Sequence, residues 1–316
     1  MTTKWSSKKL FPLAGLPLLA RSSQVNPQVK LWLAAIKPPM YSVAVIPIWV
    51  GTAVAWGSTQ QLDLPIFAAF TLGAIAIVAW LNLSNDVFDS ETGIDRNKAH
   101  SLVNLTQNKA LIFWLANLFL ALGGLGILAI AWWQRDITVL ALILVCCFLG
   151  YTYQGPPFRL GYQGLGEPIC FVTFGPLAVL AAYYSQTQSW SLPALAASVI
   201  IGVSTSLILF CSHFHQVEDD RAAGKRSPIV RLGTQRSAYL MPWTVGSIFA
   251  LTGAFVLLGA FPEWTLLLVA SLPTARTLVR HVMTHHDQPD RVSNSKFIAV
   301  SLHFWSGLLL GLGFLL

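Results

Sequence analysis

The sequence predicts an all-α, polytopic membrane protein with nine transmembrane helices. Of the 316 residues, 54% are apolar and 10% are charged, and the mean hydropathy is +0.60. A soluble domain carries about a quarter charged residues, so this chain lacks the polar surface that water requires. Long uncharged runs such as 66–81 favour helices, because the strands of a membrane barrel would be shorter and would alternate apolar with polar residues.

The hydrocarbon core of a bilayer needs about 20 apolar residues per helix. The predicted spans are, in order, 38–57, 65–86, 110–132, 137–153, 168–186, 193–214, 238–259, 263–282 and 297–316. A basic arm precedes them, and its apolar stretch 10–20 is too short to cross the membrane. We therefore expect two parts, an amino-terminal cytoplasmic arm at 1–37 and a transmembrane domain at 38–316.

The basic residues indicate the topology. When the arm and the loops after spans two, four, six and eight are taken as one side, only Arg135 of the 20 Lys and Arg residues lies on the other side. Positive charge remains cytoplasmic, so the amino terminus is expected inside and the carboxyl terminus outside. The net charge of +7 is then explained by topology and by contact with anionic membrane lipid, and no nucleic-acid partner is expected.

Acidic residues gather in two clusters on the cytoplasmic side, 82–98 after span two and 213–227 after span six. Asn82, Asp86 and Asp89 have the i, i+4, i+7 spacing of one helical stripe. Gly93 and Gly224 follow, where the chain can leave a helix. Carboxylates crowded in this way repel one another unless a cation lies between them. Oxygen ligands of this kind suit Mg²⁺, which shares its coordination with substrate phosphates.

A plainer interpretation is that interfacial acids are merely solvated and that basic loops follow from topology. The presence of two similar clusters on one face, four spans apart, favours a shared diphosphate–metal site. The bases that follow the acids, Arg96, Lys98, Lys225 and Arg226, would bind the remaining phosphate charge.

At these residues the sequence resembles the UbiA superfamily of intramembrane aromatic prenyltransferases, over nearly the whole chain. That family has nine transmembrane helices and two Asp-rich motifs, after helices two and six. Its first motif, Asn-Asp-x-x-Asp, is matched by Asn85, Asp86 and Asp89, and its last Asp corresponds to Asp95. The glycine-containing insertion before Asp95 is typical of the branch that acts on 1,4-dihydroxy-2-naphthoate.

The second motif departs from the superfamily pattern Asp-x-x-x-Asp, because Gln216 takes the first place and only Asp220 matches. Either Glu218 or Asp219 supplies the missing carboxylate, or one metal binds with a neutral ligand. The strings 212–234 and 93–106 are similar to the cyanobacterial and plastid naphthoate phytyltransferases of phylloquinone biosynthesis.

The resemblance implies Mg²⁺-dependent transfer of a phytyl or related prenyl chain from prenyl diphosphate to 1,4-dihydroxy-2-naphthoate, with loss of carbon dioxide and diphosphate, in phylloquinone or menaquinone biosynthesis. The implied catalytic and metal ligands are Asp86, Asp89, Asp95, Glu218, Asp219 and Asp220. The implied substrate-binding residues are Asn85, Arg96, Lys98, Tyr153, Arg159, His213, His215, Gln216, Lys225 and Arg226.

Some of these roles have alternatives. Tyr153 either faces the ring or the carbocation, or belongs to an interfacial aromatic belt. His213 and His215 are either candidate bases or structural hydrogen-bond partners at the helix end. The acceptor could also be homogentisate, 4-hydroxybenzoate or chlorophyllide, and a secondary transporter is the rival from another class. The lack of a long plastid transit extension favours a cyanobacterial inner or thylakoid membrane.

Overall fold

The computed structural model describes residues 32, 36, 38–94 and 101–316. The α-helices are α2 Ser42–Thr59, α3 Leu64–Thr92, α4 Leu102–Thr106, α5 Lys109–Gln134, α6 Thr138–Gln154, α7 Gly166–Val172, α8 Ala178–Thr187, α9 Leu192–His213, α10 Val217–Ala222, α11 Pro228–Leu232, α12 Thr234–Leu257, α13 Leu272–His285, α14 Pro289–Val292 and α15 Ser295–Leu315. Short 3-10 segments, Pro38–Tyr41 and Glu263–Ser271, precede α2 and α13, and a π-helical turn, Thr173–Leu177, joins α7 to α8.

Each predicted span lies on a helical segment of the described chain. Seven of these segments are long and apolar enough to cross a membrane. The other two are α6, which has 17 residues, and the segment formed by Glu263–Ser271 and α13, which carries Arg276 and Arg280. The structure is therefore all-α, with seven candidate membrane spans and shorter apolar helices beside them.

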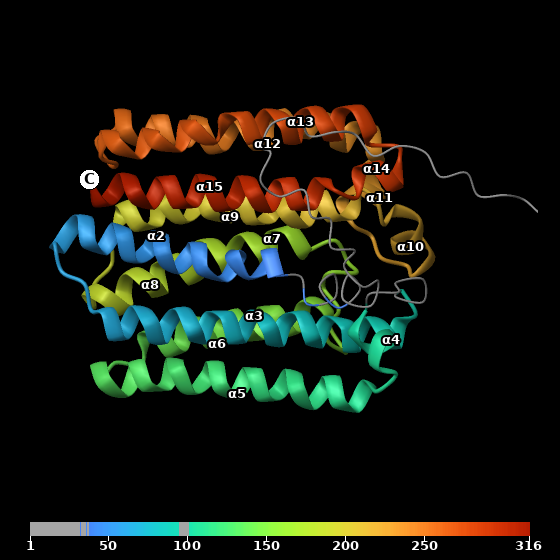
Figure 1. The fold of residues 1–316 in the computed structure, drawn as a ribbon, viewed down its shortest axis with the longest axis horizontal. Helices are drawn as coiled ribbons and strands as arrows, with labels where there is room; N and C mark the ends of the chain where they lie inside the picture. The colour runs from blue at the N-terminus through green and yellow to red at the C-terminus, as the bar shows by residue number, and fades with distance from the viewer. Residues whose placement is uncertain (1–31, 33–35, 37, 95–100) are drawn as a thin grey trace, which may run out of the picture.

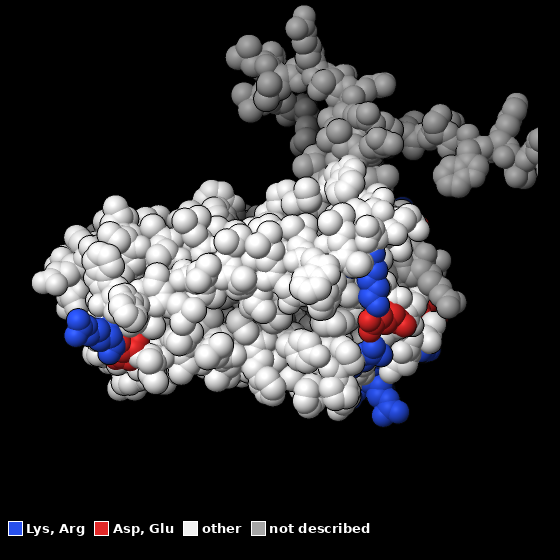
Figure 2. Space-filling view, turned by 90° about the horizontal axis from the view of Figure 1, so that it is seen from below, with Lys and Arg blue, Asp and Glu red and all other residues white. Residues whose placement is uncertain are grey.

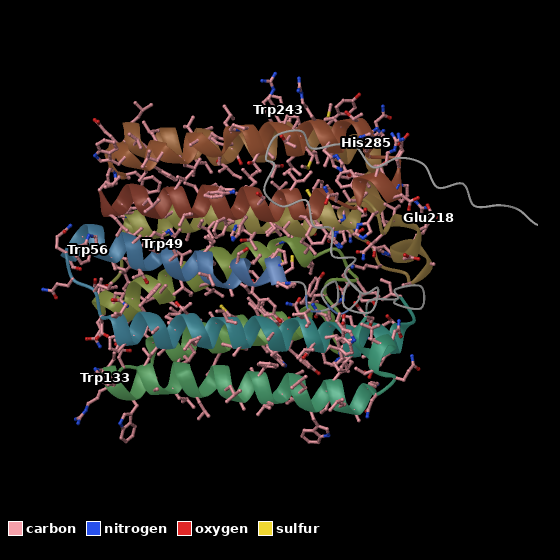
Figure 3. The ribbon with its side chains drawn as sticks, viewed as in Figure 1. Trp49, Trp56, Trp133, Glu218, Trp243 and His285 are labelled. Atoms are coloured by element: carbon pink, nitrogen blue, oxygen red, sulfur yellow. The ribbon has the colours of Figure 1, made fainter. Side chains whose placement is uncertain are left out.

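The long helices lie side by side along the longest dimension of the molecule (Figure 1). The short helices α4, α10, α11 and α14 gather at one end, and the carboxyl terminus lies at the opposite end. Charged side chains on the face shown in Figure 2 concentrate toward the two ends, and the middle is uncharged. Trp56 and Trp133 lie at the end opposite to Glu218 (Figure 3), as expected for aromatic anchors at a membrane interface.

Small residues allow the helices to pack closely, as is common where lipid provides no hydrophobic drive for association. A side chain at Gly307 or Gly311 of α15 would overlap Ile46 or Trp49 of α2. A Cβ at Gly123 of α5 would lie 2.9 Å from the backbone oxygen of Gly73 in α3. These glycines let α15 pack closely against α2 and α5 pack closely against α3.

The two acidic clusters lie differently with respect to the helices that precede them. α3 continues beyond the predicted end at residue 86 to Thr92, so Asp86 and Asp89 lie on the helix itself, and Gly93 ends it with a φ of 76°. α9 stops at His213, and the second acidic cluster forms the separate helix α10. The amide of Asp220 donates to the carbonyl of Gln216 over 2.7 Å, so these two residues are one turn apart on α10.

Candidate active site

A polar cavity of about 560 Å³ lies at the end of the bundle where the short helices gather. Helices α3, α6, α9, α10 and α15 all contribute to its walls. The polar residues that line it are Asn82, Asn85, Asp86, Asp89, Tyr153, Gln154, Ser212, His213, His215, Gln216, Asp219, Asp220, Lys225, Ser293 and Lys296. The two acidic clusters, which are more than 100 residues apart in the sequence, therefore meet in one cavity.

The first wall is the stripe predicted on α3. Asp86 is 2% exposed, and its Oδ2 accepts a hydrogen bond of 2.9 Å from the amide of Leu102. Asp89 is 9% exposed, and its Oδ1 accepts from Gln154 Nε2 at 2.9 Å and from Tyr162 at 3.4 Å. Protein donors therefore orient both buried carboxylates at the cavity wall.

The second wall comes from α10 and the turn after it. Asp220 is fully buried, and its Oδ1 lies 3.5 Å from Nζ of Lys225, which is also buried. The backbone amide of Lys225 donates to the carbonyl of Asp220 over 2.8 Å, which fixes the turn. Asp219 also lines the cavity but is exposed. A carboxylate and an ammonium group thus lie together in the wall of the cavity that the acids of α3 also line.

The loop between α6 and α7 connects the two walls through Tyr162. The Tyr162 hydroxyl lies 2.6 Å from Thr92 Oγ1, and the Tyr162 carbonyl accepts from the amide of Arg226 over 2.7 Å. Burial, together with the nearby Asp89 charge, raises the pKa of the Tyr162 phenol above its ordinary value of 10.0. The phenol therefore remains protonated at neutral pH and can donate to Asp89.

A second, apolar cavity of about 250 Å³ adjoins the first and continues between the helices. Both cavities are lined by Met40, Asn82, Asn85, Tyr153, Leu209, Ser212 and Lys296. The remaining wall is mostly aliphatic and includes Ile48 of α2 and Phe70 of α3, each 2% exposed or less. With a helical rise of about 1.5 Å per residue, Phe70 lies roughly 24 Å from Asp86 along α3.

Most of the site residues predicted from the sequence meet in the polar cavity. Glu218 does not line it: the Glu218 side chain is 81% exposed and accepts from Arg221 over 2.8 Å. Figure 3 shows Glu218 at the outer end of the bundle. Arg159 lies 3.4 Å from Glu91, and Arg226 is exposed. Asp95, Arg96 and Lys98 lie outside the described residues.

Sequence reasoning missed three residues of the site. Gln154 holds Asp89, Lys296 of α15 lines both cavities, and Oε1 of Glu167 lies 3.0 Å from Nδ1 of His213. Glu167 carries a signal that could have identified it, because an acid at the first turn of an apolar helix is costly and is therefore a functional candidate. The roles of Gln154 and Lys296 depend on contacts between distant elements, which no local pattern encodes.

The carboxylates of the cavity suit a divalent cation that keeps other ligands. Among the described residues, no group of three or more His, Cys, Asp and Glu side chains could by itself hold a metal ion. Mg²⁺ does not need such a group, because it is usually bound by one or two carboxylates, several waters and substrate phosphates. Asp86 and Asp89 of α3, with Asp219 and Asp220 of α10, are the carboxylates that would supply the protein's share of that coordination.

Comparisons with known proteins all point to one family of membrane prenyltransferases. The sequence model of the UbiA prenyltransferase family matches residues 44–308. The 2-carboxy-1,4-naphthoquinone phytyltransferase of Synechocystis is 62% identical over 90% of this chain and 93% of its own length. The chloroplastic enzyme of the same name from Arabidopsis thaliana is 41% identical over 91% of this chain and 77% of its own.

Among solved structures, a UbiA homologue from Archaeoglobus fulgidus bound to GPP and Mg²⁺ has a similar fold. Its TM-score is 0.58 at 16% identity, and the match covers 89% of this chain and 99% of that one. At this level of identity the likeness concerns the fold alone.

Proposed function

Because the chain belongs to the UbiA prenyltransferase family, we propose that it transfers a phytyl chain from phytyl diphosphate to 1,4-dihydroxy-2-naphthoate, releasing carbon dioxide and diphosphate, in phylloquinone biosynthesis. The proposed acceptor is the reduced form of the naphthoquinone for which the two phytyltransferase relatives are named. The ring must be reduced, because only an electron-rich ring attacks an allylic cation.

The observation that supports this proposal is that an acid-lined polar cavity adjoins an apolar one and shares seven lining residues with it. The diphosphate of the donor would lie in the polar cavity, beside the ammonium groups of Lys225 and Lys296. The prenyl tail would extend into the apolar cavity toward Phe70, and the roughly 24 Å between Asp86 and Phe70 along α3 suits a chain of several isoprene units. The reacting carbon then lies near Tyr153 and Asn85, which line both cavities.

Asp86, Asp89 and Asp220, with Asp219 at the rim, would hold Mg²⁺ in this cavity, and Asp95 of the first motif is a further proposed ligand. Bound Mg²⁺ would neutralise the charge of the leaving diphosphate. We leave Glu218 out of the ligand set because its side chain points to solvent.

The protein's own contribution is to position the substrates and to exclude water. Aliphatic walls around the allylic carbon keep water away, which would otherwise trap the cation as an alcohol. The acceptor ring would lie against Tyr153, with His213, His215 and Gln216 near its polar substituents. Arg159 and Arg226 would attract the diphosphate from the rim, since neither lines the cavity.

The membrane arrangement follows from the same proposal. All nine helical segments would cross the membrane, with the arm 1–37 and the acid-lined cavity on the cytoplasmic side and with 38–316 as a single catalytic domain. A cyanobacterial inner or thylakoid membrane fits the phytyltransferase relatives.

The test is prenyl transfer by the purified protein in liposomes. Phytyl diphosphate and 1,4-dihydroxy-2-naphthoate are supplied with Mg²⁺ or with a chelator, and in parallel the acceptor is supplied in its oxidised form. We expect a 2-phytyl-1,4-naphthoquinol only from the reduced acceptor with Mg²⁺. Absence of product with every aromatic acceptor, from folded protein, would refute the proposal and favour a carrier.

A further inference from the structure

We infer that Glu167 and His213 form a carboxylate–imidazole pair that removes a proton from the aromatic acceptor and then returns it. This inference rests on the proposed function and assigns the proton transfer of that reaction to one ring nitrogen. It adds Glu167, which no motif includes, and it selects His213 over the neighbouring His215.

The geometry of the pair is well defined. His213 is the last residue of α9, is 2% exposed and lines the polar cavity. Its Nδ1 lies 3.0 Å from Oε1 of Glu167, in the first turn of α7. The hydroxyl of Ser206 donates to the Glu167 carbonyl over 2.8 Å and so ties the backbone of α7 to α9. The imidazole is therefore held by two fixed helices.

This contact determines what the other nitrogen can do. A carboxylate only accepts hydrogen bonds, so Glu167 favours the tautomer that carries its proton on Nδ1. The lone pair then lies on Nε2, which is buried and has no hydrogen-bond partner among the described residues. A buried, unsatisfied acceptor in a cavity wall costs free energy unless a ligand satisfies it. The hydroxyl of the acceptor ring would supply the missing donor.

His215 is less firmly placed than His213. It lies in the break between α9 and α10 and is partly exposed, although it lines the same cavity. Lys296 also lines the cavity, but an ammonium group has donors and no lone pair with which to accept a proton. His213 thus combines rigid placement with an available acceptor.

His213 would take up one proton and return it while bonds form and break on the acceptor ring. As the carbon that bears the carboxylate attacks the allylic cation, the adjacent ring hydroxyl passes its proton to Nε2 and becomes a carbonyl. The new carbon–carbon bond leaves a quaternary carbon that carries both the prenyl chain and the carboxylate, next to that carbonyl. The carbon–carboxylate bond then breaks, carbon dioxide leaves, and the bond electrons form an enolate. Nε2 returns the proton to the enolate oxygen, which restores the aromatic quinol.

Glu167 is a positioning residue in this scheme. It fixes the ring orientation and stabilises the imidazolium that exists between the two proton transfers, as the carboxylate does in a catalytic triad.

The test compares His213→Asn, Glu167→Gln and Ser206→Ala with wild-type protein in the liposome assay. His213→Asn retains an amide near the position of Nδ1 and removes Nε2, so kcat should fall about 100-fold, in the range of general-base catalysis, with little change in KM for phytyl diphosphate. Glu167→Gln retains the acceptor oxygen and removes its charge, so kcat should fall less. Ser206→Ala keeps both members of the pair and removes only the hydrogen bond between α7 and α9, so kcat should fall less than in Glu167→Gln.

The solvent isotope effect, which is the ratio of single-turnover rates in H₂O and D₂O, provides a second readout. Wild-type protein should react more slowly in D₂O, because a proton is transferred in the rate-limiting step. An undiminished kcat in His213→Asn, or a defect confined to KM for phytyl diphosphate, would overturn the inference and leave the proposed function intact. If His213→Asn fails to fold, the inference is overturned by a wild-type kcat in Glu167→Gln together with equal wild-type rates in H₂O and D₂O. Failure of wild-type protein to form product would instead refute the proposed function.

Discussion

Replacement of Gln154 by Leu tests whether the last residue of α6 orients Asp89, one of the two buried acids of α3. Gln154 is 5% exposed, and its Nε2 donates to Oδ1 of Asp89 over 2.9 Å. Leucine has nearly the same size but no donor, so the substitution removes this hydrogen bond with little change in packing.

The magnitude follows from the contact. A hydrogen bond to a charged group contributes about 1.5–3 kcal/mol, and Asp89 is too buried for water to replace the donor freely. Since every 1.4 kcal/mol is a factor of ten, the Mg²⁺ concentration for half-maximal activity should rise about 10- to 100-fold. The bond from Tyr162 to Asp89, at 3.4 Å, is too long to compensate.

The assay is phytyl transfer at graded Mg²⁺ concentrations. Gln163→Leu is the matched control, because it is the same substitution in the adjoining loop at an exposed side chain that donates to Phe158. The control should have the Mg²⁺ dependence of wild type. If Gln154→Leu also had that dependence, the claim that this hydrogen bond orients Asp89 would be wrong.

Three further predictions concern other parts of the site. The pKa of Tyr162 is raised in the folded state, so the protonated phenol contributes its full stabilisation below pH 10 and loses it as the pH rises further. The midpoint temperature of thermal unfolding, measured from pH 9 to 11, should therefore fall more steeply for wild type than for Tyr162→Phe. Phe70→Ala should lengthen the apolar cavity and shift the preference toward longer prenyl diphosphates, measured by competition between donors, and an unchanged preference would remove Phe70 from the end of the tail site. Glu218→Gln should retain wild-type kcat and Mg²⁺ dependence, because the side chain faces solvent beside Arg221, and a loss comparable to that of Asp89→Asn would contradict this placement.

The sequence was sufficient to predict the helical segments, seven of which are candidate membrane spans among the described residues, and the stripe on α3. The spacing of Asn82, Asp86 and Asp89 requires only helical periodicity, and all three residues line the cavity. The carboxyl-terminal end of α3 was harder to predict, because its last turns are polar and resemble a loop by hydropathy. These turns are helical because they pack against other elements and because Gly93 caps the helix in the left-handed conformation.

The second cluster shows where sequence reasoning fails. Residues two apart on a helix do not face the same direction, so Glu218 and Asp220 cannot both line the wall, and the orientation of α10 decides between them. That orientation is set by the break after His213 and by the Lys225–Asp220 contact, which are tertiary features. Gln154 was missed for the same reason, since its partner Asp89 lies 65 positions away.

The most direct test of the central claim, that acids from both walls act on one Mg²⁺–diphosphate group, is the phytyl-transfer rate of Asp220→Asn. Asp290→Asn, at an exposed acid on α14 outside the cavity, is the matched control. We expect Asp220→Asn to lose activity as completely as Asp89→Asn does, and Asp290→Asn to retain it. Wild-type activity in Asp220→Asn, with Asp89→Asn inactive, would contradict the two-walled site.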